Sequence, residues 1–266
     1  MQKIVYTDLD GTLINHHTYS YEDSLEAINL LKKNKVPIVI CTSKTRVEIE
    51  RFREELNITD PFISENGGAI FIPKDYFNFD FNYDKETPEY KIIELGTSIN
   101  FLLKSLDKIK KKGYKIVNFS GMSAEELSKD SGLDLEAAKG AKMREYDEAF
   151  KIEDESQKDE ILELIEKEGY NYTAGGRYYH LLRGNDKGKA VLLLKDLFRK
   201  KYAEEEKNIK TIGLGDGLND IPMLGAVDIP ILVKNPAHPK IAINFNVKRT
   251  RLVGPKGWNK AIKELF

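Results

Sequence analysis

The sequence predicts an α/β protein with a Rossmann-like core, built on a parallel sheet, and an inserted α+β domain. Short apolar strands alternate with amphipathic helices at both ends of the 266-residue chain, a pattern typical of a parallel sheet covered by helices. The middle of the chain is more charged and favours antiparallel strand pairs, which belong to a different kind of sheet. We therefore expect residues 1–82 and 185–266 to form one core domain in two parts, with residues 83–184 inserted as a second domain.

The first part of the chain alternates strand and helix. Apolar residues recur at helical spacing in two segments, and continuous apolar runs flank them, as in strands buried on both faces. Glu65-Asn66-Gly67-Gly68 separates two further strands, and its Asn-Gly pair is a strong signal for a hairpin turn. The expected order is strand 4–7, helix 24–34, strand 36–42, helix 45–56, strand 62–64 and strand 69–72.

The middle part mixes helices with strands, and the last part returns to α/β alternation after Gly184. Ser123 followed by Glu126 is a capping-box pattern that opens a helix, and Gly175-Gly176 favours a turn between two paired strands. In the middle we expect strands 92–95, 114–119, 145–152, 170–173 and 178–182 with helices 98–112, 123–130 and 157–168. In the last part we expect helices 187–201, 219–226 and 259–265 with strands 210–214 and 228–233.

Composition excludes several classes of partner. A net charge of -1 gives no electrostatic case for binding nucleic acid or an acidic membrane surface. A single cysteine excludes an intramolecular disulfide and fits a reducing compartment. No apolar stretch approaches the roughly 20 residues needed to cross a bilayer, and no secretory segment opens the chain. We expect a cytoplasmic protein that acts on small molecules, and the sequence leaves its oligomeric state open.

Two acidic clusters follow strands at opposite ends of the chain. They are Asp8-Leu9-Asp10-Gly11-Thr12 and Gly215-Asp216-Gly217-Leu218-Asn219-Asp220. If the two strands are neighbours in a parallel sheet, both clusters lie at its carboxyl edge, where such sheets bind ligands. Converging carboxylates repel one another unless a cation lies among them, and oxygen ligands without His or Cys favour Mg2+. The expected metal ligands are Asp8, Asp10, Asp216 and Asp220, the last either directly or through water.

The first cluster suggests phosphoryl transfer. Asp8 closes its strand and can attack phosphorus as a nucleophile, giving an aspartyl-phosphate. Asp10 lies two residues on and can act as general acid and then as general base. The alternatives are a simple Asp-x-Asp-Gly turn or a calcium loop, and the latter lacks the required bidentate Glu.

Two further segments would complete such a site. Ser43 follows a strand, where a hydroxyl and the next amide can hold a phosphoryl oxygen at a helix N-terminus, although Ser43 could equally be only a helix N-cap. Lys187 begins a helix and could neutralise both the phosphate and Asp8, although a single Lys is usually solvated. Asp220 could similarly be only an acidic residue that complements a helix dipole.

These four segments, in this order, resemble the haloacid dehalogenase-type phosphatase superfamily, and the inserted domain resembles its type-2 cap. The resemblance implies a Rossmann-like core, Mg2+ and hydrolysis through an aspartyl-phosphate. It assigns Asp8 as nucleophile and metal ligand. It assigns to Asp10 a backbone carbonyl for Mg2+ and a side chain for acid/base work. Residues 42–46, 62–73, 143–146 and 176–180 are similar, more narrowly, to the mannosyl-3-phosphoglycerate phosphatases.

The narrower resemblance implies a substrate with a phosphate, a carboxylate and a sugar. Arg144 and Arg177 could clamp an anionic group with bidentate geometry. His180 could contact substrate or only pack within a strand, and Arg46 could instead pair with Glu50 on the helix surface. The expected substrate-binding residues are Lys44, Arg46, Glu65, Asn66, Arg144, Arg177 and His180.

The expected activity is Mg2+-dependent hydrolysis of mannosyl-3-phosphoglycerate to phosphate and mannosylglycerate, a compatible solute. The alternatives are phosphatases acting on glucosyl-3-phosphoglycerate, sucrose-phosphate or a hexose phosphate, then a phosphomutase, then a sugar-phosphate binder without activity. Intact Asp8, Asp10, Lys187 and Asp216 argue against the last of these.

Overall fold

The computed structural model describes residues 1–175, 177–203, 208–237 and 239–266. Its central sheet has five parallel strands in the order β13-β12-β11-β1-β2. In the register between β1 and β11, Thr7 lies opposite Leu214, so the two acidic clusters leave the sheet side by side, as the sequence predicts. The strands are β1 (Gln2–Thr7), β2 (Ile38–Ile40), β11 (Ile209–Gly215), β12 (Ile229–Lys234) and β13 (Lys248–Val253).

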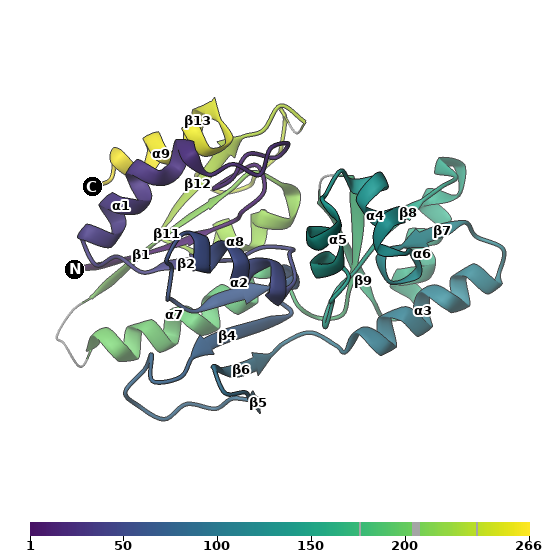
Figure 1. Ribbon diagram of the computed structural model, residues 1–266, viewed down its shortest axis with the longest axis horizontal. Helices are drawn as coiled ribbons and strands as arrows, with labels where there is room; N and C mark the ends of the chain where they lie inside the picture. The colour runs from purple at the N-terminus through teal and green to yellow at the C-terminus, as the bar shows by residue number, and fades with distance from the viewer. Residues whose placement is uncertain (176, 204–207, 238) are drawn as a thin grey trace.

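Helices cover both faces of this sheet (Figure 1). Successive strand residues point to opposite faces: Val5 packs in one apolar cluster, whereas Ile4 and Tyr6 pack in the other. The first cluster includes residues of α1 (Leu25–Lys33), α2 (Arg46–Glu55) and α9 (Gly254–Lys263), and the second includes residues of α7 (Lys187–Ala203) and α8 (Ile221–Ala226). This three-layer arrangement confirms the predicted α/β class.

A second, antiparallel sheet of order β3-β4-β6-β5 adjoins the first. Ile92 and Ile93 of this sheet pack in the two apolar clusters of the parallel sheet. The strands are β3 (Phe62–Ser64), β4 (Ala69–Pro73), β5 (Lys85–Glu86) and β6 (Tyr90–Glu94). A division after Glu94 therefore fits the sheets better than one after residue 82, and the domain boundaries stay a prediction. The two sheets with their helices are called the core.

The inserted part has its own sheet, of order β7-β8-β10-β9, and its own apolar cluster (Figure 1). Its strands are β7 (Ile116–Asn118), β8 (Glu148–Ile152), β9 (Asn171–Gly175) and β10 (Tyr178–Leu182), and its helices are α3 (Ile99–Lys111), α4 (Ala124–Ser131), α5 (Leu135–Ala141) and α6 (Lys158–Lys167). Ser123 and Glu126 form the predicted capping box. The predicted pair of strands around Gly175 forms, and Gly176 lies outside the described residues. This part is called the cap.

One helix and two strands of the described residues were not expected from the sequence. Helix α5 has only seven residues and contains Gly140, so its apolar period is too short to detect. Strand β13 lies at the sheet edge with a Lys-Arg-Thr-Arg sequence, and β5 has only two residues. Short 3-10 helices lie at Glu22–Ser24 (η1), Glu65–Gly67 (η2), Phe119–Gly121 (η3), Glu155–Gln157 (η4) and Leu218–Asp220 (η5).

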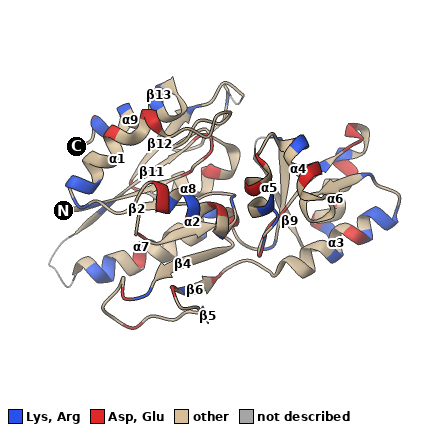
Figure 2. Ribbon diagram, in the orientation of Figure 1, with Lys and Arg blue, Asp and Glu red and all other residues tan. Residues whose placement is uncertain are grey.

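Charges of both signs are distributed over the helices of core and cap (Figure 2). Many form ion pairs between exposed side chains, such as Arg51 with Glu55 and Lys248 with Glu264. Within the described parts of the chain, no helix has the length and hydropathy to cross a membrane.

Candidate active site

Asp8 lies at the carboxyl end of β1, where the register of the sheet fixes it. Its backbone N–H donates to the carbonyl of Leu214 on β11 at 2.9 Å, and its side chain is buried. The amine of Lys187, at the first turn of α7, lies 2.7 Å from Asp8 Oδ1 and 2.6 Å from Asp220 Oδ1. Lys187 is fully buried. The structure thus brings one cation and two carboxylates, which are far apart in the sequence, into one ion-paired group.

Asp216 completes an acidic group with Asp8 and Asp220. One carboxylate oxygen of each residue lies within 4.8 Å of the others, and all three residues are buried. Burial raises the pKa of Asp8 to about 7 against the opposing charge of Lys187, and burial together with Asp8 raises the pKa of Asp216. One buried lysine therefore lies among three carboxyl groups, and their full ionisation would leave an excess of negative charge.

Each of these carboxylates is held by fixed donors. Asp216 accepts hydrogen bonds from Thr12 Oγ1 at 3.1 Å and from Asn235 Nδ2 at 2.6 Å. The second oxygen of Asp220 accepts the N–H groups of residues 216 and 217, each at 2.9 Å. Gly11 is required beside them, because its φ is +72° and a Cβ there would lie 2.4 Å from Asp216 Oδ2.

The donor set fits a hard divalent cation. The group of potential ligands found among the described residues consists of carboxylates alone, and oxygen donors suit Mg2+ better than they suit zinc. The excess of buried negative charge gives a second reason to expect a cation there. The side chain of Asp10 is outside this group, and its Oδ2 lies 3.2 Å from Lys44 Nζ. That placement agrees with a separate acid/base role for Asp10.

Ser43 lies between β2 and α2 and is partly buried. The alternative that Ser43 caps the helix is wrong: Thr45 is the N-cap of α2 and forms a capping box with Glu48. The carbonyl of Ser43 accepts a hydrogen bond from the Arg144 guanidinium of the cap at 2.8 Å. Its hydroxyl is therefore not needed for capping at this turn.

The predicted substrate residues divide into two sets. Arg46 pairs with Glu50 at 3.0 Å, as the alternative reading expects, and also lies 3.4 Å from Glu145 of the cap. Arg177 is exposed and donates to the carbonyls of Asp130 and Ser131 at the end of α4. Lys44, which lies on Asp10, is buried. The remaining predicted residues, Glu65, Asn66, Arg144 and His180, lie together in the junction of core and cap, near Asp147.

Sequence reasoning missed Asn235 and Asp147. Asn235 is the first residue after the apolar strand β12, so the rule that selected Asp8 and Asp216 could have selected it as well. Asp147 follows no such strand, and its only local signal is Arg144 three residues before it. The contacts that distinguish Asp147 come from distant segments.

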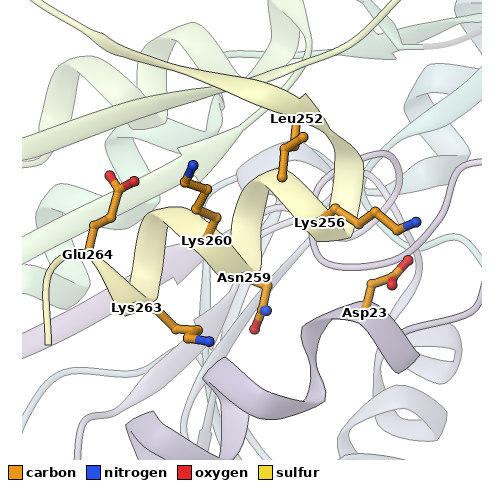
Figure 3. A pocket seen from close by; sticks show the side chains of 7 residues that line it. All are labelled: Asp23, Leu252, Lys256, Asn259, Lys260, Lys263 and Glu264. Atoms are coloured by element: carbon orange, nitrogen blue, oxygen red, sulfur yellow. The ribbon is translucent and has the colours of Figure 1, made fainter.

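A separate surface hollow of about 470 Å³ lies along α9 (Figure 3). Lys263 there is paired with Glu26, and Glu264 with Lys248. The lining residues are Asp23, Leu252, Lys256, Asn259, Lys260, Lys263 and Glu264, and none belongs to the acidic group. The hollow is not part of the candidate active site.

A model of the haloacid dehalogenase-like hydrolase family matches residues 5–247. The chain belongs to this family. It is 50% identical over 271 residues to a glucosyl-3-phosphoglycerate/mannosyl-3-phosphoglycerate phosphatase of Methanococcoides burtonii, covering 100% of this chain and 98% of that protein. It is 43% identical to a protein of the same name from Persephonella marina, over 97% of this chain and 95% of that one. A mannosyl-3-phosphoglycerate phosphatase of Pyrococcus furiosus is 34% identical, over 90% and 93%.

Solved structures agree on the fold. A Thermoplasma acidophilum protein superposes with a TM-score of 0.69 at 19% identity, covering 99% of this chain and 98% of that one. A subclass IIB sugar phosphatase of the same superfamily gives a TM-score of 0.67 at 19% identity, over 99% of both chains. Together with the family match, these findings confirm a core with an inserted cap, and the chain is a phosphoric monoester hydrolase.

Proposed function

We propose that this enzyme hydrolyses mannosyl-3-phosphoglycerate to mannosylglycerate and phosphate, with Mg2+ as its cofactor. The observation that carries the proposal is the buried group of Asp8, Asp216, Asp220 and Lys187 at the carboxyl edge of the sheet. The relatives of highest identity named above carry both the glucosyl and the mannosyl substrate in their names. That observation favours glucosyl-3-phosphoglycerate as a second substrate of the same site.

Catalysis would proceed in two displacements on phosphorus. In the first, a carboxylate oxygen of Asp8 forms a bond to phosphorus while the bond from phosphorus to the glycerate oxygen breaks, and Asp10 gives that oxygen a proton. In the second, Asp10 takes a proton from a water molecule whose oxygen attacks the aspartyl-phosphate, which releases phosphate and restores Asp8. Lys187 and Ser43 would hold the phosphoryl oxygens in line.

Mg2+ would be held by Asp8, Asp216 and Asp220 and by the backbone carbonyl of Asp10. When bound, it would neutralise charge on the phosphoryl oxygens and on the carboxylates around them.

The loop after Asp10 lies close to a cation of the core, because Lys44 Nζ is 3.2 Å from Asp10 Oδ2 and 5.2 Å from the centre of the Tyr19 ring. Burial lowers the pKa of His16, the charge of Asp10 opposes that effect, and the charges of Arg177 and Lys44 lower the pKa further. Burial raises the pKa of Tyr19, and the same two cations oppose that effect. Lys44 of the core and Arg177 of the cap therefore act on the same loop. We assign them to the carboxylate of the glycerate group, which distinguishes this substrate from neutral sugar phosphates.

We expect a panel of phosphorylated metabolites to separate the candidate substrates. With Mg2+ present, kcat/KM should be highest for mannosyl-3-phosphoglycerate and its glucosyl counterpart, because they combine phosphate, carboxylate and sugar. Sucrose-phosphate, mannose-6-phosphate and 3-phosphoglycerate each lack part of that set. Released phosphate would be measured for all five compounds. A preference for sucrose-phosphate or mannose-6-phosphate would refute the assignment of Lys44 and Arg177 to a carboxylate.

Metal removal should stop the reaction and destabilise the protein. We expect EDTA to abolish phosphate release, and excess Mg2+ to restore it. Mg2+ should also raise the Tm of the metal-free enzyme, because a cation relieves the repulsion among three buried carboxylates; at 100 times its Kd the gain is about 2.7 kcal/mol. Thermal scans with Mg2+ and with an equal ionic strength of Na+ would measure it. An EDTA-insensitive rate would exclude the metal from the mechanism.

A further inference from the structure

One segment of the cap, Arg144-Glu145-Tyr146-Asp147, is docked in the core. Tyr146 is 3% exposed and packs in an apolar cluster of the core, not of the cap. Two glycines of the core and the linker make room for it: a Cβ on Gly68 would lie 2.4 Å from the Tyr146 Cβ, and one on Gly96 2.9 Å from it. The cap therefore touches the core through this segment as well as through α5, where Thr45 of the core donates to the carbonyl of Gly140 at 2.9 Å.

Glu65 holds this segment by its backbone. The carboxylate of Glu65 accepts the N–H groups of Glu145 at 3.0 Å, Tyr146 at 2.8 Å and Asp147 at 2.9 Å. Glu65 is fully buried, and its φ of 47° and the φ of 55° at Asn66 lie in the left-handed region. Two successive non-glycine residues in that region cost roughly 1–2 kcal/mol each, so the surrounding contacts must hold the turn in place.

Asp147 is the centre of the contacts at this junction and has no exposed surface. Its Oδ1 accepts from Arg144 Nη2 at 2.8 Å and lies 2.8 Å from His180 Nδ1. Its Oδ2 accepts from Asn66 Nδ2 at 2.7 Å. Both oxygens of this one carboxylate are therefore used by side chains that come from the core and from the cap.

The partners of Asp147 reach three loops that carry candidate catalytic residues. Arg144 donates to the carbonyl of Ser43 at 2.8 Å. The Oδ1 of Asn66 accepts from Asn219 at 3.1 Å, next to Asp220, and the Asn66 carbonyl accepts from Asn185 at 3.4 Å, two residues before Lys187. These are the loops of Ser43, of Asp216 and Asp220, and of Lys187.

We propose that Asp147 is a positioning residue, through which the docked segment of the cap sets the geometry of these three loops. The proposal rests on the proposed function only in taking those loops as the site of phosphoryl transfer. It assigns Arg144, Asn66 and His180 to the support of the active site. In this structure the Nε and Nη2 atoms of Arg144 donate to Asp147 and Ser43, and the Nδ2 of Asn66 donates to Asp147.

The test compares two variants with a matched control on two substrates. Asp147→Asn weakens the hydrogen bonds that Asp147 accepts from its partners. Asn66→Gly removes the hydrogen bond between Asn66 and Asn219, and a glycine still adopts the left-handed backbone conformation. Glu148→Gln is the control, because Glu148 is equally buried in the next position, but among the described residues its carboxylate accepts hydrogen bonds from Asn118 and Ser120 of the cap. The substrates are 4-nitrophenyl phosphate, which has neither sugar nor carboxylate, and mannosyl-3-phosphoglycerate.

We expect kcat to fall about 100-fold on both substrates in Asp147→Asn and in Asn66→Gly, since a small displacement of reacting groups costs that much. KM for 4-nitrophenyl phosphate should change far less than kcat. Amide hydrogen exchange should become faster at residues 42–46 and 215–220 in both variants, and the folded fraction of Glu148→Gln should keep the kcat of the parent enzyme.

Two results would overturn the proposal. A loss of kcat confined to mannosyl-3-phosphoglycerate would show that these residues contact the substrate. An equal loss of kcat in Glu148→Gln would show that the effect is a general destabilisation of the protein. If Asp147→Asn does not fold, Asn66→Gly gives the same decision. If the parent enzyme does not hydrolyse sugar phosphoglycerates, the proposed function is wrong. The kinetics on 4-nitrophenyl phosphate and the hydrogen exchange still test the positioning role of Asp147.

Discussion

The Asp8→Asn variant should fold normally and release no measurable phosphate. Removal of a covalent nucleophile typically lowers kcat by about 10⁴-fold or more, because no bond to phosphorus can form. The metal-free variant should have a Tm equal to or above that of the parent, since one of three mutually repelling buried carboxylates is removed. Lys187 keeps its 2.6 Å contact with Asp220, so its charge stays compensated. Phosphate release and thermal scans on the same samples would measure both effects.

The matched comparison for Asp8 is Asp10→Asn, which changes the second carboxylate of the same cluster. On mannosyl-3-phosphoglycerate both variants should be nearly inactive. On 4-nitrophenyl phosphate, Asp10→Asn should still form the aspartyl-phosphate, because nitrophenolate leaves without a proton, and a burst of one nitrophenolate per enzyme should appear. A similar burst from Asp8→Asn would show that Asp8 is not the nucleophile.

The core fold could be predicted from the sequence because its signals are local. Strand β1 and strand β11 are short apolar runs, each followed at once by an acidic cluster, and their parallel direction follows from the α/β alternation. The capping boxes of α2 and α4 mark helix starts within four residues. Strand β13 was not predicted, because an edge strand with the sequence Lys-Arg-Thr-Arg has no apolar alternation. Such an edge strand pairs with a neighbouring strand on one side only.

The residues of the candidate site also divide into those with local signals in the sequence and those placed by contacts between distant segments. Asp8, Asp216 and Lys187 could be predicted because each is the first functional residue after a strand or at a helix start. The place of Arg144 could not be predicted. Its bond to Ser43 joins segments about 100 residues apart, and its partner Asp147, although only three residues on, belongs to a segment that Tyr146 docks in the core. From the sequence alone, a basic residue near a predicted anion site is interpreted as a ligand-binding residue. Only the structure shows that a carboxylate of the protein already binds it.

The Lys187→Met variant should be both inactive and much less stable. Methionine keeps the apolar stem of the buried side chain but leaves Asp8 and Asp220 without the cation that lies 2.7 Å and 2.6 Å away. Removal of one partner from a buried ion pair costs about 3–5 kcal/mol, since the remaining charge is uncompensated. Urea unfolding of the metal-free protein would measure the loss, and phosphate release should fall at least about 100-fold because the group proposed to hold the phosphoryl oxygens is gone.

Lys195→Met is the control, because Lys195 lies on the same helix and is also buried. Its partner Asp228 is 39% exposed, so water can solvate the carboxylate when the lysine is removed, and the loss should be about 1 kcal/mol or less with activity retained. Mg2+ should restore part of the stability of Lys187→Met and none of that of Lys195→Met, since only the first variant leaves an excess of charge where the cation would bind. Equal losses in the two variants, or an equal response to Mg2+, would mean that Lys187 serves the packing of α7 and not the charge of the site.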